Sequence, residues 1–471
     1  MRRQIAIILF ALFCLFPFQV HAATLKGIVT GTDVSVRPSP STNEKKIGTV
    51  NKGKDELVVL SATVLKDEST SSNKCADGWY KVEYNGGTGY VCAAYLTVVE
   101  EKPPVVDNTE AKTACQNELK KLGFPSSYWD KLCTLKTSHP NWNFVPKITG
   151  SDGKTVDFVT AVISESSCGS SSITTSAQAS FKGDSCNKKW DSGMTTASTT
   201  AVRYYLDPRN FLDEKNIFMF EDQNINKSIK DTDYKNATNK LFNNNFLVQQ
   251  IPDFTEYIRV SANSLGVSQM AVASRIKQEL GNAKLTSGKY KGKLFSVVSG
   301  DYTTRYNWYY TVNGNKVSID HYYNFFNIAA TDGSNVTQKA LIYAYNHKWG
   351  GTGNKAKDRQ TAMTGGVSFL KNSYIAVGQN TAYFQKFNIF PNNISSRFVH
   401  QYMTNVQAPV GEASILYNAY KAAGLLTQPF TFIIPVYDNL DTVVTIPSEG
   451  DPQESVGVSS AVVSSGYNYS K

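Results

Sequence analysis

A single helix, with both of its ends marked, is predicted by the stretch SQMAVASRIKQELG, residues 268–281. Ser268 is of a residue type that caps helix N-termini, and Gly281 is of the type that most often follows a helix C-terminus. The apolar residues between them recur at helical spacing and form one stripe, made of Ala273, Ile276 and Leu280. This pattern predicts a helix from Gln269 to Leu280 that packs against a core.

Glu279 falls in the last turn of this helix, where the helix dipole disfavours negative charge. A partly buried carboxyl at that place would have a raised pKa. A carboxyl that is protonated near neutral pH is what a glycosidase needs to protonate a leaving sugar oxygen. The residues alone leave a solvated helix glutamate as the alternative.

The segments on either side of this helix carry further signals. Residues 251–264 predict a preceding helix, which Leu265-Gly266-Val267 interrupts. Downstream, Asn313-Gly314 lies between two strand-like runs, an arrangement typical of a two-residue β-hairpin. We expect this hairpin to form a flap beside the cleft that holds Glu279.

The start of the chain has the three parts of a cleaved signal peptide, assigned to residues 1–22. Two arginines precede an apolar run from Ile5 to Phe18, and Val20-His21-Ala22 ends the segment. The apolar run is too short to span a membrane, and no later stretch supplies a span. We therefore expect a secreted protein of the cell wall or extracellular space, with no membrane span after cleavage.

Six cysteines follow the signal peptide, and an even number in an exported chain indicates disulfides. They fall in the sequence as three neighbouring pairs, each closing a loop of about twenty residues. Local pairing is the simplest of the roughly fifteen connectivities that six cysteines allow. It predicts the bridges Cys75–Cys92, Cys115–Cys133 and Cys168–Cys186.

Residues 23–99 predict a small β-barrel, because short strand-like runs alternate there with turns. Asn85-Gly86-Gly87 after the run 79–84 is a strong hairpin signal. The segment resembles a bacterial SH3-like domain in the blocks Val34–Ser41, Ile47–Val50, Gly78–Val82 and Gly89–Val91. That family usually holds wall peptides or glycans, which the resemblance implies as partners here. Trp79 could be a ligand platform, but we expect a tryptophan of the barrel core.

Composition divides the remainder of the chain. Residues 100–112 are charged and contain Pro103-Pro104, as in a linker. We expect residues 113–249 to form an aromatic-rich, disulfide-tied accessory region with a long Ser/Thr/Gly-rich loop at 151–195. Residues 250–427 would form the catalytic domain, and 428–471 a C-terminal extension that begins with a strand-like run and ends disordered.

Five blocks between residues 252 and 412 resemble glycoside hydrolase family 73, in the family's own order. They are AVASRIKQELG at 271–281, YYNFFNI at 322–328, Gly365-Gly366, residues 374–388 and residues 400–405. The accessory region resembles a segment that precedes the catalytic part in clostridial-type wall glucosaminidases. The expected fold class is therefore a small SH3-like all-β barrel, followed by a mainly α, lysozyme-like catalytic domain with a β-hairpin flap.

The resemblance also implies an activity and its residues. Members of the family cleave the β-1,4 bond after N-acetylglucosamine in peptidoglycan, which implies the glycan strands of the wall as the substrate here. Glu279 matches the family's general acid, and Tyr323 would act beside it in catalysis. The implied substrate-binding residues are Asn324, Phe326 and Tyr402. No cofactor is implied.

One departure from the family concerns the second carboxylate. The chain is longer than its relatives between residues 281 and 322, and the candidates there for a second acid are Asp301 and Asp320. An inverting enzyme would use that acid as a base, and a retaining one could use it as a nucleophile. Alternatively, the substrate's own acetamido group attacks, oriented by Tyr323. Because the matched blocks contain one acid, we expect this second route; a lytic transglycosylase that uses the same glutamate stays open.

Other classes of function fit the sequence less well. The net charge of +9 is scattered, without a nucleic-acid motif, and fits a polyanionic wall better than DNA. Since H-E-x-x-H or a comparable ligand spacing does not occur, we expect no metal site and disfavour a zinc amidase. Cys168 or Cys186 could serve a cysteine peptidase, but we favour their pairing in a disulfide. A noncatalytic wall-binding or adhesion protein is the second hypothesis.

Overall fold

The computed structural model describes residues 24–61, 63–70, 72–101, 109–166, 172–175, 181–183, 194–281, 309–312, 314–319, 321–330 and 336–440. The chain divides into two compact units, Met1–Glu110 and Ala111–Lys471. Each unit has a hydrophobic core of its own. The expected signal peptide, the third cysteine pair, Asp301, Asp320 and the tail beyond residue 440 lie outside the described residues.

The first unit is a seven-stranded antiparallel sheet with the strand order β3-β2-β6-β5-β4-β1-β7. Its elements are β1 (Thr24–Val29), β2 (Val34–Arg37), β3 (Gly48–Val50), β4 (Glu56–Val59), β5 (Trp79–Tyr84), β6 (Gly87–Cys92), the short 3-10 helix η1 (Ala93–Tyr95) and β7 (Leu96–Glu101). Alternate residues of these strands point inward, as the two-residue period of a strand requires. The core consists of Val29, Val34, Val36, Val50, Leu57, Val59, Val82, Val91 and Leu96.

The hairpin between β5 and β6 confirms the turn predicted from the sequence. Asn85 and Gly86 both have positive φ, 50° and 74°, as the tight hairpin turn of an Asn-Gly pair requires. Gly89 follows on β6, where a Cβ atom would come within 2.5 Å of Val36. The close approach of β2 and β6 therefore depends on glycine at this position.

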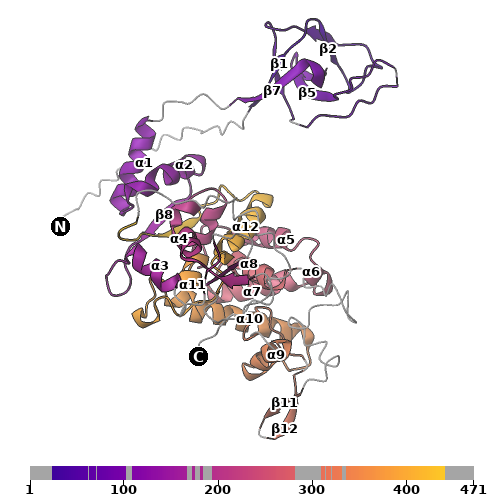
Figure 1. Cartoon of the computed structure of the whole chain (residues 1–471). Helices are drawn as coiled ribbons and strands as arrows, with labels where there is room; N and C mark the ends of the chain where they lie inside the picture. Colours follow the sequence, from indigo (N-terminus) through magenta and orange to yellow (C-terminus); the bar gives the residue numbers. More distant parts are fainter. Residues whose placement is uncertain are drawn as a thin grey trace, which may run out of the picture. The chain divides into compact units, whose positions relative to one another are not determined.

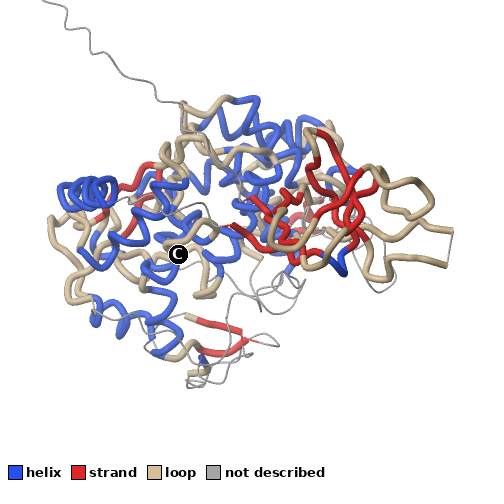
Figure 2. Tube along the Cα trace, turned by 90° about the horizontal axis from the view of Figure 1, so that it is seen from above, coloured by secondary structure: helices blue, strands red, loops and turns tan. Residues whose placement is uncertain are grey.

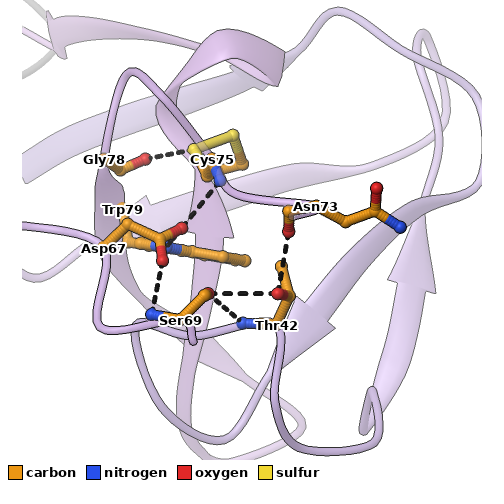
Figure 3. The surroundings of a disulfide bond; sticks show 8 residues. Thr42, Asp67, Ser69, Asn73, Cys75, Gly78 and Trp79 are labelled. Atoms are coloured by element: carbon orange, nitrogen blue, oxygen red, sulfur yellow. Dashed lines mark hydrogen bonds between the residues drawn. A yellow bond between two sulfur atoms is a disulfide. The ribbon is translucent and has the colours of Figure 1, made fainter. Parts of the chain in front are cut away.

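Trp79 belongs to the barrel core, as expected. Its side chain is buried, and its indole N–H donates to Asp67 Oδ2 at 2.8 Å, in the surroundings of the Cys75–Cys92 disulfide (Figure 3). The same carboxylate accepts the backbone N–H groups of Ser69 and Cys75. Although desolvation opposes it, these hydrogen bonds lower the pKa of Asp67 to about 2.

The second unit is mainly helical, with a few short strands (Figures 1 and 2). Its first half contains α1 (Thr109–Leu122), α2 (Ser126–Ser138), β8 (Asn143–Lys147), α3 (Phe158–Ser166), β9 (Ile173–Thr175), β10 (Met194–Thr196), α4 (Thr199–Leu206), η3 (Pro208–Phe211), η4 (Asn216–Phe220), α5 (Asp231–Leu241) and α6 (Phe246–Gln250). The second half contains α7 (Phe254–Leu265), α8 (Gln269–Leu280), β11 (Tyr309–Val312), β12 (Asn315–Ser318), α9 (Val336–Asn346), α10 (Lys355–Ser373), η7 (Ile375–Val377), α11 (Ala382–Phe387), η8 (Ile394–Ser396), α12 (Ala408–Ala422) and β13 (Thr431–Pro435).

One core extends through the whole of this unit, which corrects the predicted division. Strand β8 pairs in parallel with β13, from Asn143 opposite Thr431 to Lys147 opposite Pro435. The buried cluster runs in sequence from Leu119 to Tyr437. The regions 113–249 and 250–427 and the start of the extension therefore share a core, and the boundaries at 249/250 and 427/428 do not separate folding units.

Several local predictions can be compared with the structure. The predicted strand-like run after residue 429 is β13, and the predicted hairpin at 313–314 is β11–β12, which projects beside α9 in Figure 1. The disulfides Cys75–Cys92 and Cys115–Cys133 are present as predicted. The prediction of a long loop at 151–195 was wrong in part, because this segment contains α3, β9 and the start of β10. Buried apolar residues of α3, including Phe158 and Val162, give that segment a helical stripe that its Ser/Thr content concealed.

With the SH3-like sheet followed by a mainly helical unit, the predicted fold class is confirmed.

Candidate active site

Helix α8 begins and ends at the predicted residues and packs against α5, α7 and α12 (Figure 1). The Ser268 side chain accepts from the Ala271 N–H, and Gly281 follows the last turn with a φ of 52°. Glu279 lies in that last turn and is 3% exposed. Its backbone carbonyl accepts from Asn327 Nδ2 at 3.1 Å, which ties the end of α8 to the block at 322–328. The helix therefore holds the predicted acid in a nearly dry environment.

Tyr402 is the aromatic residue that lies close to Glu279. Burial, followed by the negative charge of Glu279, raises the pKa of the Tyr402 phenol well above its usual range. One ring face of Tyr402 is covered by the guanidinium of Arg275, whose Cζ lies 4.0 Å from the ring centre. Tyr374 packs edge-on against the same ring, with 5.0 Å between the centres. The predicted substrate-binding residue is thus fixed on two sides next to the predicted acid.

Arg275 and Glu412 form a buried ion pair behind Tyr402. Arg275 donates from Nε and Nη2 to Glu412 Oε2, at 3.1 and 2.8 Å, and both side chains are almost wholly inaccessible to solvent. Sequence reasoning did not single out either residue. The one available signal was the spacing of Arg275 and Glu279, four residues apart on a predicted helix, which places both on one face.

The block at 322–328 places its predicted site residues inside the core. Tyr323 is fully buried, stacks on Phe325, and has the Arg359 guanidinium 5.6 Å from its ring centre. Asn324 is also fully buried, and its amide donates to the carbonyls of Ile328 and Ala340 and accepts the Ile328 N–H. The Asn324 side chain therefore stabilises its own loop through hydrogen bonds to the backbone.

Phe326 has a packing environment of the same kind. It is 1% exposed, and its ring lies so close to Gly366 that a Cβ there would come within 2.1 Å of it. The Gly365-Gly366 pair of the matched blocks is thus explained by a close approach of α10 to this loop. The described contacts of Phe326 shape the loop. Its predicted contact with substrate stays a proposal.

A glycine-rich loop at 349–354, between α9 and α10, was missed by sequence reasoning. Asp358 is buried and accepts the backbone N–H groups of Thr352 and Gly353, which fixes the loop at the start of α10. The other side of the loop pairs with the block at 322–328, since Gly351 N–H donates to the carbonyl of His321. Gly350 has a φ of 130°, and a Cβ there would lie 2.2 Å from that carbonyl oxygen. The cluster of glycines after Trp349 was the signal that could have revealed it.

Two further features, a metal site and a membrane-spanning helix, are absent from the described residues. Within the described ranges, no three His, Cys, Asp or Glu side chains are grouped so that they could hold a metal ion. Among the same residues, none of the helices is both long and apolar enough to cross a membrane.

Comparison with known proteins defines the first unit. Residues 32–97 match the model of the bacterial SH3 domain, so the resemblance recognised for this unit is confirmed. A second similarity is to an autolysin. Over 177 residues the chain is 30% identical to a protein named bifunctional autolysin from Staphylococcus epidermidis. That match covers 38% of this chain and 11% of the autolysin, so the chain spans about a tenth of that relative's length.

Solved structures of two further proteins are similar. Glucosaminidase B of S. aureus aligns with 63% of this chain and 94% of its own, at 18% identity and a TM-score of 0.39. A catalytic mutant of S. aureus autolysin E, in complex with the disaccharide NAG-NAM, aligns with 57% of this chain and 93% of its own, at 16% identity and a TM-score of 0.36. The resemblance to wall autolysins, recognised in the sequence, is confirmed by the similarity to the bifunctional autolysin.

Proposed function

We propose that the protein is a secreted peptidoglycan hydrolase that cleaves the β-1,4 bond between N-acetylglucosamine and N-acetylmuramic acid, with Glu279 as the general acid. The observation that carries the proposal is the burial of the Glu279 carboxyl in the last turn of α8, beside Tyr402. Exclusion of water and the helix C-terminus both favour the protonated carboxyl, which is the form that donates to a leaving oxygen. The similarity to autolysins and glucosaminidases supports the substrate class.

For the second half of the reaction we propose the acetamido route. Glu279 protonates the glycosidic oxygen while the acetamido oxygen of the cleaved N-acetylglucosamine attacks the anomeric carbon; water then opens the cyclic intermediate, with retention of configuration. An internal nucleophile has the proximity advantage of an intramolecular reaction. Tyr323 stays our candidate for steering the acetamido group, and Tyr402 joins it because the charge of Glu279 acts on its phenol. Asn324 and Phe326 contribute by shaping the loop that carries Tyr323.

The SH3 domain would hold a peptide or glycan of the wall, and the signal peptide would direct the protein to the wall or outside the cell. With Trp79 in the barrel core, the ligand contacts of this domain would come from other residues. The net positive charge of the chain supports binding to a polyanionic wall. A noncatalytic wall-binding protein is the alternative, and the burial of Glu279 in the last turn of α8 speaks against it.

Digestion of purified cell wall by the full-length protein tests the proposal. We expect muropeptides that end in a reducing N-acetylglucosamine, identified by mass spectrometry after borohydride reduction. Glu279→Gln should abolish release while leaving the thermal unfolding curve and wall binding unchanged, because glutamine cannot supply the proton. Glu118→Gln, on the exposed face of α1, is the matched control and should cut at the wild-type rate.

Two results would overturn parts of the proposal. Anhydro-muropeptides would show a lytic transglycosylase, and full activity of the Glu279→Gln variant would remove Glu279 as the acid. NMR of the first-formed sugar anomer decides the stereochemistry. An inverted product would exclude the acetamido route and make Asp320, followed by Asp301, the first candidate for a base that activates water.

A further inference from the structure

The buried ion pair of Arg275 and Glu412 has no role in the mechanism so far. We infer that Arg275 and Glu412 are positioning residues, which seat Tyr402 beside Glu279 and keep the surroundings of that acid free of net charge. The inference rests on the proposed function, because it concerns the same glutamate. Their side chains are 1% and 0% exposed and hydrogen-bond to each other, so we assign them an effect on the reaction through Tyr402 and Glu279 rather than a contact with substrate.

The position of Arg275 on α8 links the pair to the acid. Arg275 and Glu279 are four residues apart, so both lie on one face of the helix. The Cζ atom of Arg275 lies 4.0 Å from the ring centre of Tyr402. The charge of Glu279 acts on the phenol of the same tyrosine. The Tyr402 ring is therefore packed against the cation of Arg275 and lies within electrostatic reach of Glu279. A shift of the guanidinium would move the ring that borders the acid.

The guanidinium in turn has little freedom to shift. Its Nη2 donates to Gln385 Oε1 on α11 at 2.6 Å as well as to Glu412 on α12. Glu412 also accepts from Ser274 Oγ at 3.1 Å and from Gln223 Nε2 at 3.5 Å. Gln385 closes the ring by donating to Gln223 Oε1 at 2.7 Å. Three separate segments thus converge on Arg275, and the network depends on both members of the ion pair.

The two partners differ in what happens when one is removed. Arginine cannot lose its proton in a protein, so without Glu412 a full positive charge would persist one helical turn from Glu279. That charge would favour the ionised form of Glu279, which cannot act as an acid. The neutrality that Glu412 provides is therefore a condition for keeping the proton on Glu279.

Among the described residues, the other charged groups near α8 are directed away from Glu279 or paired elsewhere, so the charge balance at Glu279 depends on Arg275 and Glu412. Lys277, on α8 itself, turns toward Phe242, with its Nζ 5.7 Å from that ring centre. Arg259 on α7 forms ion pairs with Asp231 on α5 and with Glu256 on α7. Asp231 also accepts a hydrogen bond from Gln269, in the first turn of α8. This turn lies about 15 Å along the helix from Glu279. The other titratable groups on the described helices packed against α8 are Asp233, Tyr234, Lys235 and Lys240 on α5, Tyr257 on α7, and Tyr417, Tyr420 and Lys421 on α12. Tyr374, before η7, packs on Tyr402, and the charge of Glu412 acts on Glu221.

The test uses the full chain with soluble glycan strands, and measures kcat and KM as functions of pH. For Glu412→Gln we expect the alkaline limb of the kcat/KM profile to move to lower pH by roughly one unit, because the remaining cation favours ionised Glu279. For the double variant Arg275→Met/Glu412→Leu we expect the limb to return to within about 0.3 unit of wild type, since the site is neutral again. Its kcat should still fall about tenfold, with KM changed less than about twofold, because Tyr402 has lost its support.

Asp207→Asn is the matched control. Asp207 and Arg209 form another buried acid–arginine pair of this unit, with side chains 6% and 2% exposed, and neither contributes to the contacts around Tyr402. The variant should lose stability, as judged by its thermal unfolding, without moving the pH profile. The double variant replaces a buried pair with apolar residues, which often preserves folding, and so decides the matter if Glu412→Gln does not fold.

Two outcomes would overturn the inference while leaving Glu279 as the acid. One is a Glu412→Gln variant with the same pH profile as Asp207→Asn. The other is a double variant with wild-type kcat. Failure of the proposed function itself would instead appear as undiminished activity in Glu279→Gln.

Discussion

The buried carboxyl of Glu221 should make the second unit less stable as the pH rises through neutrality. Glu221 follows η4 and accepts the hydroxyl of Tyr420 at 2.8 Å. Burial, with smaller contributions from the charges of Asp222 and Glu412, raises the pKa of Glu221 from 4.5 to about 8, although the Tyr420 hydrogen bond opposes this. The folded protein therefore keeps a proton on Glu221 that the unfolded chain releases above pH 4.5.

The magnitude follows from proton linkage. Below pH 4.5 the carboxyl is protonated in both states and has no effect on the pH dependence. Between pH 4.5 and about 8 the folded state binds one more proton, so the free energy of unfolding falls by about 1.4 kcal/mol for each pH unit. Replacement by glutamine mimics the protonated carboxyl at every pH. Glu221→Gln should therefore match wild type near pH 4 and exceed it by about 4 kcal/mol at pH 8.

Calorimetric or denaturant unfolding of the full chain at several pH values measures this difference. Glu214→Gln is the control, because Glu214 accepts a hydroxyl from Tyr417, also on α12, but its side chain is 47% exposed. The stability difference for the control should be nearly constant with pH. A Glu221→Gln variant whose advantage over wild type does not grow between pH 5 and pH 8 would refute the reasoning.

Three further changes have defined outcomes. Asp67→Asn should lower the stability of the SH3 domain by about 1–2 kcal/mol at pH 7. Because the pKa of Asp67 is lowered from 3.8 to about 2, this stabilisation is present above pH 3.8 and is lost as the pH falls through 2. Acid titration of the unfolding signal would show the loss. Asn324→Ala should destabilise the second unit by about 2–4 kcal/mol, since three backbone groups lose a buried partner; a change in KM without a lower melting temperature would contradict this structural role. Replacing Cys115 and Cys133 by alanine should cost about 3 kcal/mol in the chain-entropy model, measured as a lower melting temperature, and an unchanged melting temperature would count against it.

Features determined by neighbouring residues were predictable from the sequence. Both ends of α8 were located because a capping serine and a terminal glycine act within a few residues of the positions they mark. The Asn85-Gly86 turn is similar, since the conformation it requires is one that few other residue pairs adopt. Glu279 was chosen as the candidate acid by its place on such a helix together with the family resemblance.

The features that escaped prediction depend on partners far away in the chain. Arg275 and Glu412 are 137 residues apart, and nothing local to either indicates that the other neutralises it. Asn324 was predicted to bind substrate because it lies in a matched block, and its hydrogen bonds to the backbone of Ile328 and Ala340 were not foreseen. The extent of the catalytic core was misjudged for the same reason, since an apolar run such as 430–436 does not reveal which strand it will join.

The pairing of β8 with β13 has a consequence for how the protein comes to be active. Asn143 and Thr431 are 288 residues apart in the sequence, so the strand that completes the core is synthesised long after its partner. Contacts between such distant segments form slowly, because a long loop must close before any of them exists. The helices around Glu279 would therefore stay incompletely packed until β13 has joined β8. Any activity that depends on this packing would appear only after both strands have been synthesised.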